Sequence, residues 1–126
     1  MAVRIRQAPH EVKFMPNQTN NIQAVRDFWQ KANVVSINTV ILVKASVVYT
    51  NARTGQTLYR SNGPIDVQID TVNDCEVIVP ALPDELGCFG TFSTYWQDMK
   101  WENGVLTIKG EGNPHVGKDP YIVTLM

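Results

Sequence analysis

The adjacent residues Asn103 and Gly104 are the feature that most constrains how this chain folds. Asn-Gly strongly favours the centre of a two-residue type I′ hairpin turn, because both positions of that turn need a positive φ. A turn at this point pairs residues 98–102 with residues 105–109 and joins two strands. The apolar side chains then share one face of the hairpin, as a half-buried sheet requires: Met99, Trp101, Leu106 and Ile108.

The amino-acid composition also favours strands. The 126 residues include 16 Val, 9 Ile and 10 Thr against 6 Leu and 7 Ala, and β-branched side chains pack well on a pleated sheet. With 44% hydrophobic and 18% charged residues, the chain is too apolar for a disordered tail and too short for two ordinary domains. No apolar run is long enough to span a bilayer or to form a signal peptide, so we expect a protein made in the cytoplasm without secretion.

An alternating pattern predicts a long strand over residues 37–49. The odd-numbered residues of this segment are apolar apart from Thr39, so they form the expected core face. A turn should follow in which Asn51 pairs with Gln56, and this register places Tyr49 opposite Leu58. Shorter strands are expected further along the chain, at residues 65–69, 75–79 and 121–125.

Two segments depart from the strand pattern. Residues 80–87 contain two prolines and should form a connection that crosses from one sheet to the other. Residues 89–96 lose the alternation, so their aromatic side chains need either a bulge or two buried faces.

One short helix is predicted in the first third of the chain. From Asn21, taken as the N-cap, apolar residues recur every three or four positions up to Ala32, which is the spacing of one helix face. The pattern as a whole predicts an all-β fold: a single β-sandwich or jelly-roll-like barrel of about eight strands, with one short helix around residues 22–32. Residues 1–16 are assigned to an N-terminal arm, and residues 17–126 to the sandwich domain.

The net charge of −1 excludes the uniform positive field of a protein that coats nucleic acid. The charge is unevenly distributed, because residues 1–60 carry eight bases and two acids (+6), whereas residues 61–126 carry three bases and ten acids (−7). If strands from the two halves interleave, the asymmetry disappears in space, and we expect this outcome. The alternative is a basic surface on one copy that meets an acidic surface on the next.

The sequence contains no recognisable catalytic motif. Cys88, His115 and Asp119 could supply a nucleophile, a base and an orienting group, but no nucleophile elbow or similar signature surrounds them. We therefore interpret Cys88, like Cys75, as a small buried hydrophobic residue, and predict that the protein is not an enzyme. Two histidines without metal-ligand spacing, and glycines that flank Glu111 without opening a helix, predict neither a metal nor another cofactor.

Aromatic side chains raise a second hypothesis, carbohydrate binding, because an exposed ring stacks on the apolar face of a sugar. Tyr95, Trp96 and Trp101 lie close together in the sequence. The hairpin register already assigns Trp101 to the core face, which leaves Tyr95 and Trp96 as candidate sugar-binding residues. A lectin-like module is therefore the alternative interpretation.

The remaining features favour binding to other protein chains. In the arm, apolar and basic residues alternate over residues 3–6, so this segment could add a strand to a neighbour's sheet, or it could be the first strand of a compact monomer. The loop at residues 110–120, rich in Gly and Pro, is long enough to have a function of its own. The predicted partner-binding residues come from these two segments: Val3, Arg4, Ile5, Arg6, Lys13, Asn113, His115, Lys118 and Asp119.

These features together predict a non-enzymatic structural protein. Small, cysteine-poor all-β proteins without an active site commonly serve in virus particles, so the hypothesis is a tailed-phage (bacteriophage) virion component, such as a capsid decoration or cement protein. Its partners would be shell subunits and copies of itself in a homo-oligomer, with neither nucleic acid nor a membrane. Many weak contacts would then add up in the particle.

Overall fold

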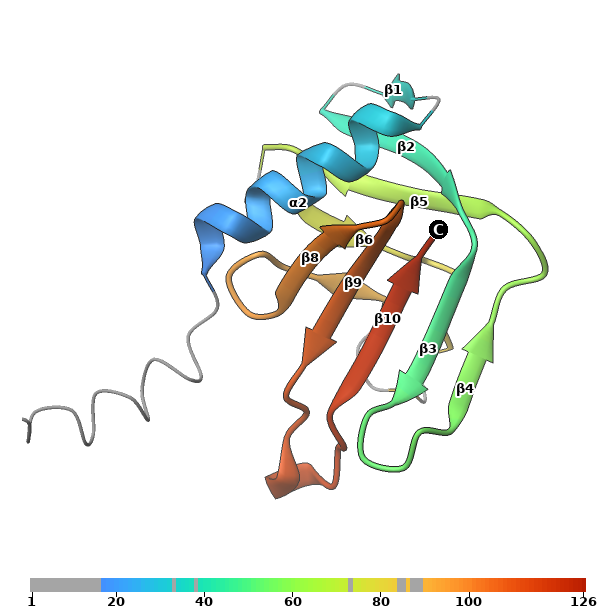
Figure 1. The fold of residues 1–126 in the computed structure, drawn as a ribbon, viewed down its shortest axis with the longest axis vertical. Coiled ribbons are helices and arrows are strands. Elements are labelled where there is room, and N and C mark those ends of the chain that lie inside the picture. Colours follow the sequence, from blue (N-terminus) through green and yellow to red (C-terminus); the bar gives the residue numbers. More distant parts are fainter. Residues whose placement is uncertain (1–16, 33, 38, 73, 84–85, 87–89) are drawn as a thin grey trace, which may run out of the picture.

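Two antiparallel five-stranded sheets pack face to face around one apolar core (Figure 1). The computed structural model describes residues 17–126 except 33, 38, 73, 84–85 and 87–89. Sheet A has the order β1 (Val34–Ile37), β2 (Val40–Ala45), β5 (Ile65–Asp70), β6 (Glu76–Ile78) and β7 (Thr91–Phe92). Sheet B has the order β4 (Thr57–Arg60), β3 (Val47–Asn51), β10 (Tyr121–Leu125), β9 (Val105–Gly110) and β8 (Asp98–Glu102).

The described residues also form one α-helix, α2 (Gln18–Lys31), and a 3₁₀ turn at Pro114–Val116. The predicted all-β sandwich with one short helix is therefore confirmed, although it has ten strands in the described part rather than about eight. The predicted N-terminal arm lies outside the described residues.

A single residue, Ser46, carries the chain from sheet A into sheet B. β2 ends at Ala45 and β3 begins at Val47, and the strands of the two sheets run across one another (Figure 1). Ala45 and Val47 are both buried, so the alternation of the sequence continues through the bend. The backbone N–H and carbonyl of Ser46 are bonded to the backbone of Met126, at 2.9 and 3.0 Å. Met126 therefore fastens this corner of the sandwich.

The single long strand predicted over residues 37–49 is wrong. Residues 34–37 turn back and pair with residues 40–43, so Thr39 lies exposed in a turn and not on a core face. The register pairs Ser36 with Ile41, so the turn shifts the alternation by one residue, and a continuous pattern of odd-numbered apolar residues could not show it. From residue 43 onward the predicted core face is confirmed, because four odd-numbered residues are buried: Val43, Ala45, Val47 and Tyr49.

The hairpin of β8 and β9 confirms the prediction in all five residue pairs. Asn103 and Gly104 have φ values of 55° and 79°, as a type I′ turn requires. The predicted apolar face lies toward the core. Trp101 is half-buried on this face, with its ring 6.0 Å from that of Phe28 and 5.4 Å from the ammonium nitrogen of Lys31. Packing therefore accounts for Trp101.

The turn after β3 is confirmed, but the predicted register beyond it is wrong. The backbone N–H of Asn51 donates to the carbonyl of Gln56 at 2.8 Å, as expected. The ladder then shifts by one residue, so that Tyr49 faces Tyr59 and not Leu58. Leu58 is the extra residue of this irregularity, and its side chain is 40% exposed.

The strands predicted at residues 65–69, 75–79 and 121–125 are confirmed as β5, β6 and β10. The connection after β6, however, does not cross between sheets as predicted. The backbone N–H of Val79 donates to the carbonyl of Gly90 at 2.6 Å, and β7 pairs with β6, so the chain returns to sheet A. It crosses to sheet B after β7, within residues 93–97. The prolines marked a connection but carried no information about its destination.

α2 begins earlier than the predicted boundary at residue 22. Asn17 is the N-cap, and its side-chain oxygen accepts a hydrogen bond from the backbone N–H of Asn20 at 3.1 Å. Asn21, which was expected to be the cap, lies inside the helix and is only 3% exposed. The apolar spacing starts at Ile22, so the polar first turn produced no periodic signal.

Asn21 joins α2 to the turn at 93–97 and to β8 by three hydrogen bonds. Its Nδ2 donates to the carbonyls of Thr94 (3.1 Å) and Gln97 (2.9 Å), and its Oδ1 accepts from the backbone N–H of Met99 (2.9 Å). The same side of the helix buries Val25 in the core, and α2 contacts β8 and β9. The helix therefore closes the side of the sandwich next to β8.

Replacing Asn21 with Ala should lower the free energy of unfolding by about 3 kcal/mol, because two carbonyls and one N–H lose a buried partner. Urea unfolding followed by tryptophan fluorescence measures the change. Gln23→Ala, on the exposed side of the same helix, is the matched control and should cost less than about 0.5 kcal/mol. Equal losses in the two variants would show that the bonds of Asn21 do not hold the helix in place.

Candidate binding cleft

A cleft of about 530 Å³ opens between the sheets at the end where β3 leaves the core. We call it the end cleft. Its walls come from β3, β4, β7, β10, Leu86, the turn at 93–97 and the loop at 111–120. The polar lining residues are Asn51, Thr91, Gln97, Glu111, Asn113, Lys118 and Asp119. The larger apolar and aromatic lining residues are Tyr49, Leu58, Leu86, Trp96, Pro120 and Tyr121.

Trp96 lies on a short, well-bonded turn between β7 and β8, and its side chain is 75% exposed. The backbone N–H groups of Trp96 and Gln97 both donate to the carbonyl of Ser93, at 3.1 and 3.0 Å. The N–H of Ser93 in turn donates to Oε1 of Gln97 at 2.7 Å, and Asn21 binds the same turn from α2. The indole is thus held on an ordered turn without contributing to the core.

Tyr121 forms a wall of the end cleft and is held by four neighbours. Its ring lies directly over Gly110, where a Cβ would overlap the ring atoms. The ring stacks on that of Tyr49, with centroids 5.3 Å apart, and lies 5.9 Å from that of Phe92. Its phenol oxygen accepts a hydrogen bond from Nε2 of Gln97 at 3.1 Å. These contacts come from separate segments, so they fix the ring in one position.

Arg53 and Asp119 form a bidentate ion pair beside the end cleft. Nε and Nη2 of Arg53 donate to the two carboxylate oxygens at 2.9 and 3.0 Å, and Nδ2 of Asn51 donates to the same carboxylate at 2.9 Å. The hydrogen bond from Arg53, followed by that from Asn51, lowers the pKa of Asp119, and the same pairing raises the pKa of Arg53. The charge of Asp119 is therefore balanced within the protein.

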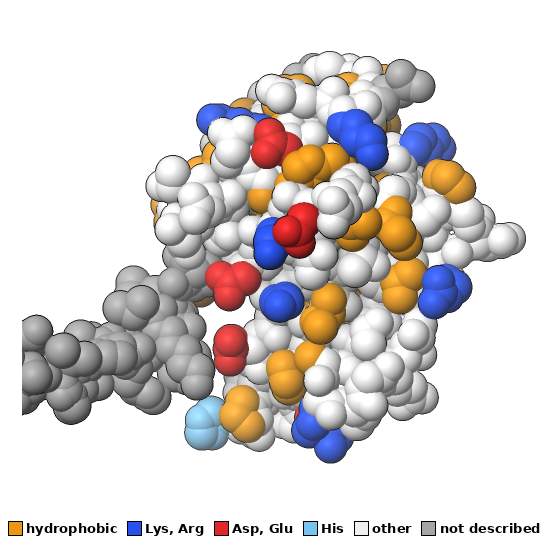
Figure 2. All heavy atoms as spheres, viewed as in Figure 1, with side chains coloured by type: hydrophobic (Ala, Val, Ile, Leu, Met, Phe, Trp, Pro, Cys, Tyr) orange, Lys and Arg blue, Asp and Glu red, His pale blue; other side chains and the backbone are white. Residues whose placement is uncertain are grey.

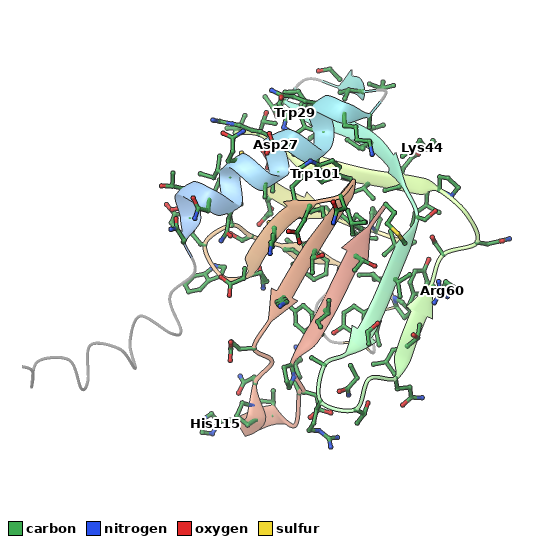
Figure 3. All side chains as sticks on the ribbon, in the orientation of Figure 1. Asp27, Trp29, Lys44, Arg60, Trp101 and His115 are labelled. Atoms are coloured by element: carbon green, nitrogen blue, oxygen red, sulfur yellow. The ribbon has the colours of Figure 1, made fainter. Side chains whose placement is uncertain are left out.

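The loop at residues 111–120 is folded on itself. The backbones of Asn113 and Lys118 are bonded in both directions at 2.9 Å, and the 3₁₀ turn lies between them. The side-chain oxygen of Asn113 accepts from the backbone N–H of His115 at 3.0 Å. His115 itself is exposed at the tip of the loop, away from the body of the protein, and does not line the end cleft (Figure 3).

The structure places the predicted site residues in different locations. Among those expected to bind partners, Asn113, Lys118 and Asp119 line the end cleft, whereas His115 does not. The expected arm residues lie outside the described part of the chain: Val3, Arg4, Ile5, Arg6 and Lys13. Of the candidate sugar-binding pair, Trp96 lines the end cleft, while Tyr95 is 50% exposed but is not among the lining residues.

Sequence reasoning missed Gln97 and Tyr121 as site residues. Tyr121 was assigned only to a strand, and nothing in the local sequence relates it to Gln97. One signal was available, because Gly110 and Tyr121 flank the long loop and face each other when the two strands pair as a hairpin. An aromatic ring opposite a strand glycine commonly covers that glycine.

The hypothetical catalytic set is not brought together among the described residues. Cys88 lies outside them, His115 is at the loop tip, and Asp119 is bonded to Arg53 and Asn51. Cys75 is buried, as predicted, and burial is the main cause that raises the pKa of its thiol. In the part of the chain that the structure describes, no group of three or more His, Cys, Asp or Glu could hold a metal ion.

The charges of the two halves of the chain are mixed in space. The ion pairs Lys44–Asp66 and Arg53–Asp119, both at 2.9 Å, each join a base from the first half to an acid from the second. Figure 2 shows basic and acidic side chains interspersed over one face of the molecule. For the described residues, these pairs support the expectation that the strands interleave the opposite charges.

No protein-family model, curated protein or solved structure matches this chain. None of the helices in the described residues is long and apolar enough to cross a membrane. A functional proposal therefore rests on the surface and the end cleft.

Replacing Asp119 with Asn should lower the thermal midpoint at about pH 7 and have a smaller effect in acid. The folded-state pKa of Asp119 is depressed, so its ion pair stabilises the fold above the unfolded-state pKa. That contribution is lost as the pH falls through the folded-state pKa. Thermal unfolding from about pH 7 to about pH 2 should therefore show the two proteins converging. A constant difference over this range would contradict the assigned role.

Replacing Gly110 with Ala should cost about 1–3 kcal/mol in the free energy of unfolding, because the new Cβ overlaps the ring of Tyr121. A double-mutant cycle measured by urea unfolding isolates this clash. In a Tyr121→Ala background, the cost of Gly110→Ala should fall to less than about half its value in the native sequence, since no ring remains to collide. If Gly110→Ala costs the same in both backgrounds, its destabilisation does not come from a clash with the ring of Tyr121.

Proposed function

We propose that this protein is a non-enzymatic structural component that joins copies of itself and shell subunits, with the particle of a tailed phage as its setting. The observation that carries the proposal is the edge strand β1. Val34 is 38% exposed and Val35 is 58% exposed, although successive side chains of a strand point to opposite faces. An edge strand with exposed apolar side chains is a template on which another strand can pair.

The occupant that fits this edge is residues 3–6 of a neighbouring copy. The segment alternates Val3 and Ile5 with Arg4 and Arg6, and a strand of that pattern can pair with β1 through backbone hydrogen bonds. Sixteen residues precede the described part of the chain, and an extended segment of that length spans about 50 Å. An extended arm would therefore be more than twice as long as α2, which measures about 21 Å.

The charge of sheet A supports the same occupant. Val67 and Ile69 are buried, so the residues that alternate with them on β5 lie on the outer face of this sheet. Among the described strands of sheet A, the charged side chains are three acids and one base: Asp66, Asp70, Glu76 and Lys44. Lys44 pairs with Asp66 at 2.9 Å, so three acids and one base leave these strands a net charge of −2, which attracts a basic arm.

Deleting residues 1–8 should convert an oligomer of the full chain into monomer, while the thermal midpoint measured at low concentration stays nearly unchanged. Sedimentation velocity over a range of protein concentrations measures the association. Val35→Lys, a change on the edge strand, should weaken association about tenfold or more, because the lysine must be desolvated in the paired sheet. Val116→Lys is the control, since Val116 is 65% exposed at the opposite end of the molecule, and it should associate normally.

A full chain that stays monomeric at every concentration would refute assembly through the arm. A monomer that is destabilised by Val35→Lys and by the deletion would instead mean that the arm pairs with its own sheet. The phage setting has a separate test in the genes that flank this one: capsid and portal genes would support it, and a metabolic operon would contradict it.

A further inference from the structure

We infer that the end cleft is a binding site for a neutral saccharide, with Trp96 as the surface on which one sugar ring stacks. This function goes beyond assembly, because it uses no residue of β1 or of the arm. Three features point to this class of ligand: an exposed indole on a well-bonded turn, polar side chains with unused bonding directions, and a balanced charge.

The exposure of Trp96 is not explained by packing. The indole is 75% exposed, yet its turn is closed by backbone bonds to Ser93 and held from α2 by Asn21. A pyranose ring presents C–H groups on one face, and that face loses water favourably when it stacks on an indole. Because the backbone of the turn is already ordered, binding costs little backbone conformational entropy.

Polar side chains in the end cleft can bond to sugar hydroxyls. Among the described residues, Gln97 uses one amide N–H on Tyr121, and Asn51 uses one on Asp119, so each amide keeps a second N–H. The carboxylate of Asp119 accepts three hydrogen bonds, from Arg53 and Asn51, of the roughly four that it can accept. Hydroxyl groups both donate and accept, so they match this mixture of donors and an acceptor.

The charges around the end cleft favour a neutral ligand. The charged lining residues of the described chain are Glu111, Lys118 and Asp119, and Arg53 lies behind Asp119. These two acids and two bases cancel, so a phosphorylated, sulfated or sialylated ligand would find no surplus of cations. An apolar ligand is also unsuitable, because it would cover the polar lining without satisfying it.

The size of the end cleft fits one or two sugar rings. Its volume of about 530 Å³ falls within the range of roughly 300–1,000 Å³ that is typical of small-ligand sites. The ring of Tyr121 is held over Gly110, so it forms a rigid wall on the inner side of the end cleft. The site therefore needs little rearrangement before a ligand enters.

The test begins with the full chain on an array of neutral and anionic glycans. It continues with NMR titrations that use maltose, lactose and chitobiose as neutral probes and sialyllactose as the anionic probe. We expect binding to neutral glycans, with shifts of the Trp96 indole N–H and of Gln97. Trp96→Ala should weaken this binding about tenfold or more, as loss of an aromatic platform generally does.

Tyr95→Ala is the matched control, because it removes an adjacent ring that is 50% exposed but does not line the end cleft. Its affinity should equal that of the unmodified chain. Equal weakening in both variants, preference for sialyllactose, or no binding to any glycan would each overturn the inference. Val35→Lys should leave sugar affinity unchanged, so a failure of the assembly proposal and a failure of this one are distinguishable.

Discussion

The structure depends on one geometric constraint: two sheets whose strands cross must share a single apolar core. The chain meets this constraint at Ser46, where it bends from β2 into β3 while Ala45 and Val47 both stay buried. Sheets that meet at such a corner diverge away from it, which leaves the far sides to be closed by other elements. α2 closes the side next to β8, and the side beyond the end of β3 stays open as the end cleft.

Asn21 links this architecture to the proposed ligand site. Its three hydrogen bonds satisfy buried backbone groups at the point where the chain crosses from β7 to β8. The same bonds order the turn that presents Trp96 to solvent. Stability and site geometry therefore have a common origin, because the buried amide that holds the helix also orders the backbone of the turn that carries Trp96.

The two proposed surfaces lie at different ends of the molecule. β1 is at one end, whereas the loop at residues 111–120, which forms part of the end cleft, extends from the other (Figure 1). The proposed pairing at β1 would therefore leave the proposed ligand site exposed to solvent. The opposite charges of the two chain halves pair within the folded domain, because Lys44–Asp66 and Arg53–Asp119 each join one half to the other.

The features that depend on neighbouring residues could be predicted from the sequence. The turn at Asn103 and Gly104 set the register of β8 and β9, and the period of two identified the buried faces of β3 and β5, because turn chemistry and pleating are local. Three other features became clear only from the folded chain: the role of Asn21, the return of the chain to sheet A after β6, and the composition of the end cleft. Those outcomes depend on contacts such as Arg53 with Asp119, which are 66 residues apart, and no local pattern encodes which distant groups will meet.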